Sequence, residues 1–221
     1  MNDIKNYDTI VFDLDGTLID TLEDLKDSVN YAMNVYGFPE RSLEEIRTFV
    51  GNGVGKLIER AIPDGIENPL YKECLKVFQD HYSKNMQNKT APYNGIKELL
   101  AELKDRGFKM AVVSNKFDSA VKKLVKEFFG DYIKVAIGES ENVSRKPAPD
   151  TVIKALAELG SAPDKAVYVG DSEVDVMTAK NSKLTCIGVT WGFRTREVLE
   201  KEGAQYIIDE PHQLLSILDK Y

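Results

Sequence analysis

The sequence predicts an α/β fold, a doubly wound and mostly parallel sheet, with an all-helical domain inserted into it. Three observations predict it. Apolar strand-like runs alternate with helical patterns from about residue 92 to the end of the chain, and the β-branched and aromatic run 10–12 adds one strand near the start. Residues 17–90, which lie between them, carry helical spacing and no strand signal. We therefore expect an α/β core at 1–16 and 91–221 and a helical cap domain at 17–90.

The elements of the core follow from short apolar runs and from the glycines and prolines that end them. Successive strands and helices are joined by short connections, which is typical of a Rossmann-like parallel sheet covered on both faces. We expect strands at 10–12, 110–113, 135–137, 166–169, 185–189 and 206–208, and helices at 95–106, 120–129, 149–159, 174–180, 197–201 and 214–218.

Helical spacing dominates the inserted domain. Ser42 followed three residues later by Glu45 predicts a capping box at the start of one helix. The glycines of the stretch from Gly51 to Gly55 interrupt the pattern, so we expect a loop there. The expected helices are 22–36, 43–50, 56–62 and 67–86.

Composition and charge exclude several classes of partner. The chain has 29 Lys and Arg against 36 Asp and Glu, a net charge of −7, and no long basic run, which disfavours nucleic acid and anionic membranes. No apolar run approaches the length of a membrane span, the opening residues are polar, and Cys74 and Cys186 fit no metal spacing. We expect a cytoplasmic protein with reduced thiols, and we infer no obligate protein partner.

Two acidic side chains stand at the mouth of the first strand. Asp13 and Asp15 alternate with Leu14, so both carboxylates leave the strand on the same side. Such a pair repels itself unless a cation lies between the two groups or they share a proton. A simple turn is the alternative, because Asp and Gly are common where strands end.

Polar residues also follow other strands of the predicted sheet. In open parallel sheets ligands bind at the carboxyl ends of the strands, so these residues should meet at one edge. Ser114, Asn115, Lys146, Asp171 and Asp175 are the residues concerned. Taken singly, each fits a helix cap or a solvated loop. Together with the two acids they predict one site.

The motifs in this order resemble those of a known superfamily. DLDGT, VVSN, KPAP and GDSEVD resemble the four motifs of the haloacid dehalogenase-like hydrolases, in the branch with a helical cap after the first strand. Three weaker signals, at 49–53, 114–116 and 189–192, resemble the phosphoglycolate phosphatases within that superfamily. The resemblance covers essentially the whole chain.

The resemblance implies a Mg²⁺-dependent phosphatase that hydrolyses a small phosphorylated metabolite, with 2-phosphoglycolate as the best single guess. Asp13, the first acid after the strand, is the candidate nucleophile that forms an aspartyl-phosphate, and Asp15 is the candidate acid and base. The resemblance assigns Mg²⁺ to Asp13, the carbonyl of Asp15 and Asp171, with Asp175 behind them. The expected phosphate-binding residues are Asp13, Leu14, Asp15, Ser114, Asn115 and Lys146.

The substrate and the reaction type leave alternatives open. Candidates for substrate selection are Gly51, Asn52 and Gly53 of the cap and Lys116 of the core. A phosphomutase of the β-phosphoglucomutase type and an inorganic pyrophosphatase are possible on the same fold. A non-catalytic regulator that binds a phosphorylated ligand is the alternative outside enzymes, and the intact set of acids argues against it.

Overall fold

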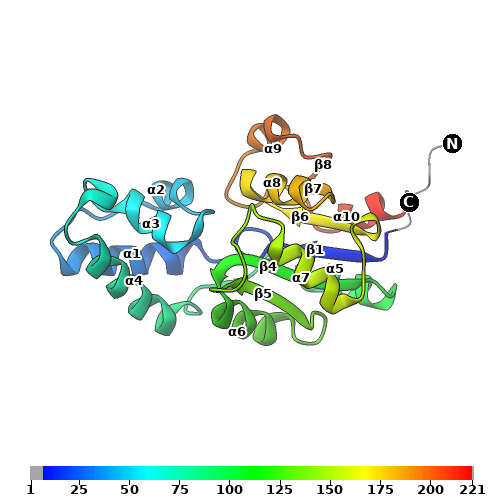
Figure 1. Cartoon of the computed structure of the whole chain (residues 1–221), viewed down its shortest axis with the longest axis horizontal. Helices are drawn as coiled ribbons and strands as arrows, with labels where there is room; N and C mark the ends of the chain where they lie inside the picture. Colours follow the sequence, from blue (N-terminus) through cyan, green and yellow to red (C-terminus); the bar gives the residue numbers. More distant parts are fainter. Residues whose placement is uncertain (1–6, 221) are drawn as a thin grey trace. The chain divides into compact units, whose positions relative to one another are not determined.

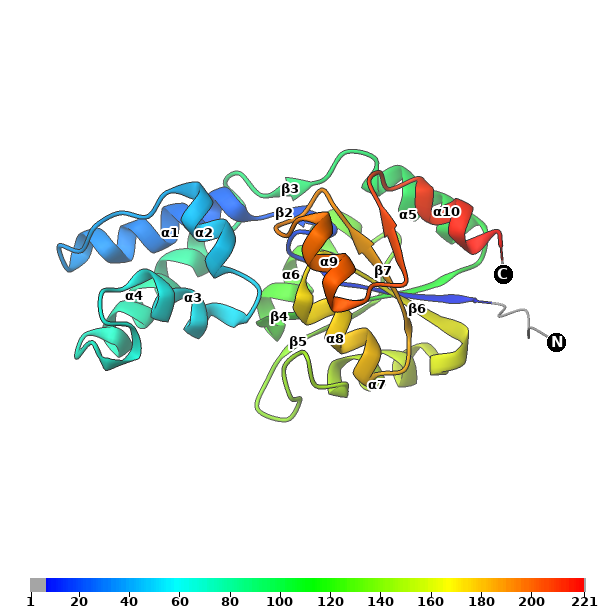
Figure 2. The same cartoon turned by 90° about the horizontal axis from the view of Figure 1, so that it is seen from above.

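The computed structural model describes residues 7–220 (Figures 1 and 2). The described chain forms two compact units, one made of residues 7–19 with 92–220 and one made of residues 20–91. We call them the α/β unit and the helical unit. The sequence-based boundaries were 16/17 and 90/91. In the described residues no helix is both long enough and apolar enough to cross a membrane.

The α/β unit is built on a parallel sheet whose strand order, β5-β4-β1-β6-β7-β8, puts the first strand in the middle. All neighbouring strands of this sheet run parallel, as the sequence predicts. β1 therefore has β4 on one side and β6 on the other, and the carboxyl ends of these three strands lie next to one another. The strands are β1 (Thr9–Phe12), β4 (Lys109–Phe117), β5 (Val135–Glu139), β6 (Ala166–Gly170), β7 (Thr185–Val189) and β8 (Tyr206–Ile208).

Helices cover this sheet on both faces. In Figure 2, α5 and α10 lie on one side of the sheet, and α7 and α8 lie on the other. All four residues of β1 are buried, which is why its sequence is a continuous run rather than an alternating one. The helices are α5 (Ile96–Asp105), α6 (Asp118–Phe129), α7 (Asp150–Leu159), α8 (Glu173–Asn181), α9 (Arg196–Glu202) and α10 (Gln213–Leu218).

The helical unit confirms two predicted helix starts, at Leu22 and Leu43, and corrects the other two. The Ser42–Glu45 capping box is present: the Glu45 amide donates to Ser42 Oγ (3.2 Å), and the Ser42 amide donates to Glu45 Oε2 (2.8 Å). The helices are α1 (Leu22–Val35), α2 (Leu43–Phe49), α3 (Gly53–Ala61) and α4 (Tyr71–Asn85), with a short 3₁₀ turn at Gly65–Glu67.

The expected loop at Gly53 to Gly55 is wrong, because α3 already begins at Gly53. Each glycine costs a helix about 1 kcal/mol, but the buried Leu57 and Ile58 fix this helix by tertiary packing. The start of the last helix at 67 is also wrong. The Asn68 carboxamide accepts the Leu70 amide (2.9 Å) and delays that helix to Tyr71.

The two ends of the helical unit are joined by one buried carboxylate. Asp24, which is 2% exposed, accepts the amides of Lys89 and Thr90 (3.0 and 2.9 Å) and the Thr90 hydroxyl (2.8 Å). Beside it, β2 (Ile19–Asp20) pairs with β3 (Ala91–Pro92) where the chain passes between the units. We expected no strand between 17 and 90, and β2 corrects this, since two residues are too few to show a periodicity.

Candidate active site

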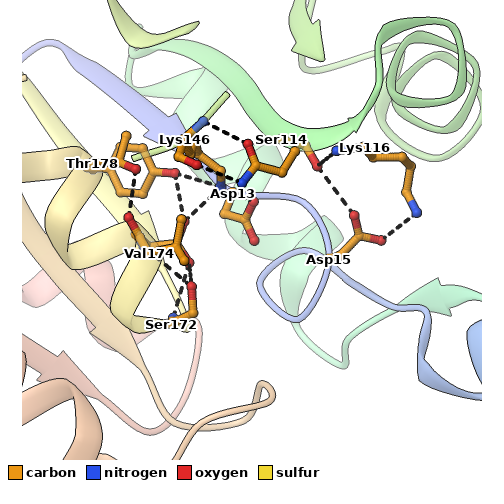
Figure 3. A network of polar contacts seen from close by, with 11 residues as sticks. Asp13, Asp15, Ser114, Lys116, Lys146, Ser172, Val174 and Thr178 are labelled. Carbon is orange, nitrogen blue, oxygen red and sulfur yellow. Dashed lines mark hydrogen bonds and ion pairs between the residues drawn. The ribbon is translucent and has the colours of Figure 1, made fainter. Parts of the chain in front are cut away.

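Asp13 is fixed at the carboxyl end of β1 by the sheet itself. Its amide donates to the carbonyl of Val169 (2.8 Å), so the pairing with β6 continues one residue beyond the strand. The carboxylate is buried, and its Oδ1 lies 2.5 Å from Nζ of Lys146 (Figure 3). The structure thus brings together two residues that are far apart in the sequence and that the strand-end argument assigns to one edge of the sheet.

Lys146 comes from the connection after β5 and is held by the end of β4. Its amide donates to Oδ1 of Asn115 (2.7 Å), and Nδ2 of Asn115 donates to its carbonyl (3.0 Å). The sequence places Asn115 among the phosphate-binding residues. In the structure its carboxamide oxygen and one of its N–H groups bind the Lys146 backbone, so Asn115 positions the lysine.

The Lys146 ammonium has three acceptors, one for each of its protons. Besides Asp13 it donates to Asp175 Oδ1 (2.8 Å) and to Oη of Tyr168 (3.1 Å), and the Tyr168 hydroxyl in turn donates to the same Asp175 oxygen (2.8 Å). Burial alone would lower the pKa of Lys146, but the Asp13 and Asp175 carboxylates raise it, so the lysine stays charged.

Tyr168 is the residue that sequence reasoning missed. It lies inside the apolar run of β6, and we interpreted it as core. Burial raises the pKa of its hydroxyl well above the usual value. The usable signal was chemical: a buried tyrosine hydroxyl needs a hydrogen-bond partner, and in a strand that ends at a site the partner is a site residue.

Asp175 anchors the lysine. Its Oδ2 accepts the Ser172 amide (3.1 Å) and hydroxyl (2.5 Å), and its Oδ1 accepts from Lys146 and Tyr168. A carboxylate has about four acceptor positions, and four donors take them here. Burial would raise the pKa of Asp175, but Lys146 lowers it. Gly170 permits this packing, since a Cβ there would lie 2.4 Å from Asp175 Cγ.

Asp171 follows β6 and is enclosed by two glycines. A Cβ on Gly16 or on Gly192 would lie 2.4 Å from its Oδ2. That oxygen accepts the amide of Phe193 (2.6 Å), which belongs to the loop after β7. The neighbouring Trp191 indole donates to the Thr17 carbonyl (3.0 Å), so the same loop also supports the turn after β1.

The acidic residues fit a divalent cation. Carboxylate oxygens of Asp13, Asp171 and Asp175 lie within 4.8 Å of one another, and one ammonium, Lys146, contacts the group directly. Burial and the Asp175 charge raise the pKa of Asp13 to about 7, and burial with the same charge raises that of Asp171 well above its usual range. Because the acceptor positions of Asp175 are already occupied by four donors, Asp13 and Asp171 are the carboxylates with room for a cation.

Asp15 is held apart from this cluster by β4 (Figure 3). Its Oδ2 accepts from the Ser114 hydroxyl at 3.4 Å, and its Oδ1 lies 3.0 Å from Nζ of Lys116. Ser114 and Lys116, two residues apart at the end of β4, thus both contact the Asp15 carboxylate. Leu14, between the two acids, is buried in the turn, and its carbonyl accepts the Leu18 amide (3.0 Å).

The remaining predicted residues belong to the helical unit. Gly51, Asn52 and Gly53 lie at the N-terminus of α3, where Asn52 is the N-cap residue. Their part in substrate selection stays a prediction.

Comparison with known proteins identifies the family. The profile of the haloacid dehalogenase-like hydrolases matches residues 10–189. The chain is 32% identical to a phosphoglycolate phosphatase of Aquifex aeolicus, over 96% of this chain and 97% of that protein. It is also 32% identical to a phosphoglycolate phosphatase of Pseudomonas putida, over 93% of this chain and 78% of that protein.

A solved structure agrees with these relatives. A Lactobacillus delbrueckii protein assigned as a phosphoglycolate phosphatase superimposes with a TM-score of 0.92 at 37% identity, and the match covers 96% of this chain and 98% of that one. The match of the family profile to most of the chain settles the classification: this chain belongs to the haloacid dehalogenase-like hydrolases.

Proposed function

We propose that the chain is a Mg²⁺-dependent phosphatase that hydrolyses a small phosphate monoester, and that 2-phosphoglycolate is its substrate. The observation that carries the proposal is the buried contact of Asp13 with Lys146, next to a second buried acid, Asp171. The relatives of Aquifex aeolicus and Pseudomonas putida carry the name of this activity.

Asp13 is the nucleophile of this reaction. Its Oδ1 is bound by Lys146, which leaves Oδ2 to attack phosphorus. The new oxygen–phosphorus bond gives an aspartyl-phosphate as the bond to the ester oxygen breaks. Burial raises the pKa of Asp13 to about 7, and the nearby ammonium opposes this rise by favouring the ionised carboxylate that this step requires. Asp13, Asp171 and the Asp15 carbonyl would hold Mg²⁺, which would supply positive charge to offset the charge of the phosphoryl oxygens.

Asp15 moves the protons. It gives a proton to the leaving ester oxygen, and it then takes one from the water that hydrolyses the aspartyl-phosphate. The Ser114 hydroxyl, which lies 3.4 Å from Asp15, is placed to bind a phosphoryl oxygen as well. The two acids therefore have separate roles: Asp13, beside Lys146, is the nucleophile, and Asp15, beside Ser114, is the acid and base.

The test is phosphate release from 2-phosphoglycolate by the full-length protein with Mg²⁺. Turnover should stop on chelation and return when Mg²⁺ is added. Asp13→Asn should lower kcat by at least about 10³-fold while substrate binding, measured by calorimetry, survives, because the amide cannot act as the nucleophile. Asp105→Asn, an exposed change at the end of α5, is the matched control and should leave kcat unchanged.

Three outcomes would contradict the proposal. Substantial turnover by Asp13→Asn would remove Asp13 as the nucleophile. Activity that needs a bisphosphate activator and releases little phosphate would indicate a phosphomutase. No turnover of any phosphate ester by the folded, Mg²⁺-loaded protein would indicate a binding protein.

A further inference from the structure

Lys116 is a second buried lysine close to the proposed reaction centre. Its side chain is 5% exposed and, like the Ser114 hydroxyl, contacts the Asp15 carboxylate. Its Nζ lies 3.0 Å from Oδ1 of Asp15, the proposed acid and base. Lys146, the other lysine of the site, already has three acceptors for its three protons.

Stability alone is a poor reason for this ion pair. Removing two charges from water costs about as much as their attraction returns, so apolar side chains would serve the fold as well. The pair is also close without being aligned, because the buried Oδ1 of Asp15 accepts no hydrogen bond of good geometry. The attraction between Lys116 and Asp15 is therefore mainly Coulombic, and another anion nearby can compete with Asp15 for the ammonium.

We propose that Lys116 is a specificity-determining residue that binds a carboxylate on the leaving group of the substrate, in exchange for Asp15. The inference rests on the proposed function. Asp15 must reach the ester oxygen to protonate it, so a cation that touches Asp15 lies beside the leaving alcohol. In 2-phosphoglycolate one methylene group separates the ester oxygen from the carboxylate, which brings that carboxylate close to Lys116.

The exchange also frees the acid. Once the substrate carboxylate takes the ammonium, Asp15 loses the ion pair that holds it on the β4 side, and its carboxyl group can turn to the ester oxygen. A phosphate ester whose alcohol part is uncharged offers no such second anion and leaves Asp15 bound to Lys116. The favoured substrates are thus short phosphate esters that carry a second negative charge on the alcohol.

The experiment compares 2-phosphoglycolate with ethyl phosphate, which has the same chain with a methyl group in place of the carboxylate. Wild-type kcat/KM should be higher for 2-phosphoglycolate by about 10- to 100-fold, the range of one hydrogen bond to a charged group. Lys116→Met should remove most of that ratio by lowering the value for 2-phosphoglycolate, and Lys116→Arg should restore part of it. Calorimetry of both ligands with Asp13→Asn and with Asp13→Asn/Lys116→Met gives the same comparison without turnover.

Lys122→Met is the matched control, because Lys122 is a mostly exposed lysine of α6 paired with Asp118 (2.6 Å). It should leave the ratio unchanged. Equal wild-type values for the two esters, or an equal loss for both in Lys116→Met, would overturn the proposal and leave Lys116 as a support for Asp15. The wild-type ratio needs no variant, so a variant that fails to fold does not remove the test. If the wild-type protein hydrolyses neither ester, the result would instead contradict the proposed phosphatase activity.

Discussion

The hydroxyl of Tyr168 connects Lys146 and Asp175, the two residues that hold the Asp13 side of the site in place. It accepts from Lys146 and donates to Asp175, inside a strand whose other side chains are apolar. Without it the lysine would lose its third acceptor. A buried donor without a partner is costly, and a lysine with one free proton can shift away from Asp13.

We therefore expect Tyr168→Phe to lower kcat for 2-phosphoglycolate by about 10-fold while KM changes little, because the lost bond positions the lysine rather than the substrate. Steady-state kinetics measures kcat and KM separately. Tyr132→Phe, a half-buried tyrosine of the same unit, is the control and should behave as the wild type. An unchanged kcat in Tyr168→Phe would show that Asp13 and Asp175 hold the lysine alone.

At this scale the sequence predicts what stands at strand ends and misses what lies within strands. The structure brings Lys146 to Asp13, and Ser114 to Asp15, in the order that the strand-end argument requires. Tyr168 was hidden because its strand is apolar. The saturation of Asp175 by Ser172 and Tyr168 was also hidden, because side-chain partners depend on packing that no local pattern encodes.

At the scale of elements, Asp24 shows how a helix can be stabilised from outside itself. The carboxylate lies in the first turn of α1, where a negative charge also interacts favourably with the helix dipole. Its acceptors are filled by the amides of Lys89 and Thr90 and by the Thr90 hydroxyl, which belong to the other end of the helical unit. One side chain thus serves as the hydrogen-bond acceptor of two backbone amides at the far end of the unit.

We expect Asp24→Ala to lower the free energy of unfolding by about 2–4 kcal/mol, since it leaves buried donors without an acceptor. Urea unfolding followed by circular dichroism measures it. Asp27→Ala is the matched control on the same helix. Asp27 is partly exposed and pairs with Nζ of Lys89 (2.7 Å), so its loss should cost less than about 1 kcal/mol. Equal effects of the two changes would contradict the role of Asp24.

The predicted elements differ from the observed ones where packing overrides local preference. β4 runs on through its polar residues to Phe117 because Phe117 still pairs with Glu139 of β5. The glycines of α3 favour a loop locally, but the packing of Leu57 makes them helical. The strands β7 and β8 have the predicted bounds, since both are short apolar runs flanked by clear turn residues.

At the scale of the whole molecule, the buried acids predict a dependence of stability on pH and Mg²⁺. The pKa of Asp13 rises on folding from 3.8 to about 7, so between these values the unfolded chain loses a proton that the folded protein keeps. Stability therefore falls as pH rises through this window, by about 1.4 kcal/mol per pH unit for this group. Asp171 acts with the same sign, and Asp175, whose pKa is lowered, acts with the opposite sign.

Bound Mg²⁺ should cancel this fall, because a cation stabilises the ionised acids. We expect Mg²⁺ to raise the Tm more at about pH 7.5 than at about pH 5.5, as measured by calorimetry with Mg²⁺ and with chelator. Asp13→Asn should reduce the difference, and the surface change Asp105→Asn should preserve it. An equal rise in Tm at both pH values would show that these acids do not bind the ion.

The central place of β1 has a consequence for synthesis of the chain. Thr9 pairs with Lys109 and with Ala166, so β1 cannot form its sheet hydrogen bonds until these later segments have been synthesised. Residues 20–91, by contrast, are continuous, and their helices can pack as soon as they emerge. The nascent protein should therefore carry a finished helical bundle and a β1 segment that has no strand partner until translation has passed Val112 and lacks its second partner until it has passed Val169.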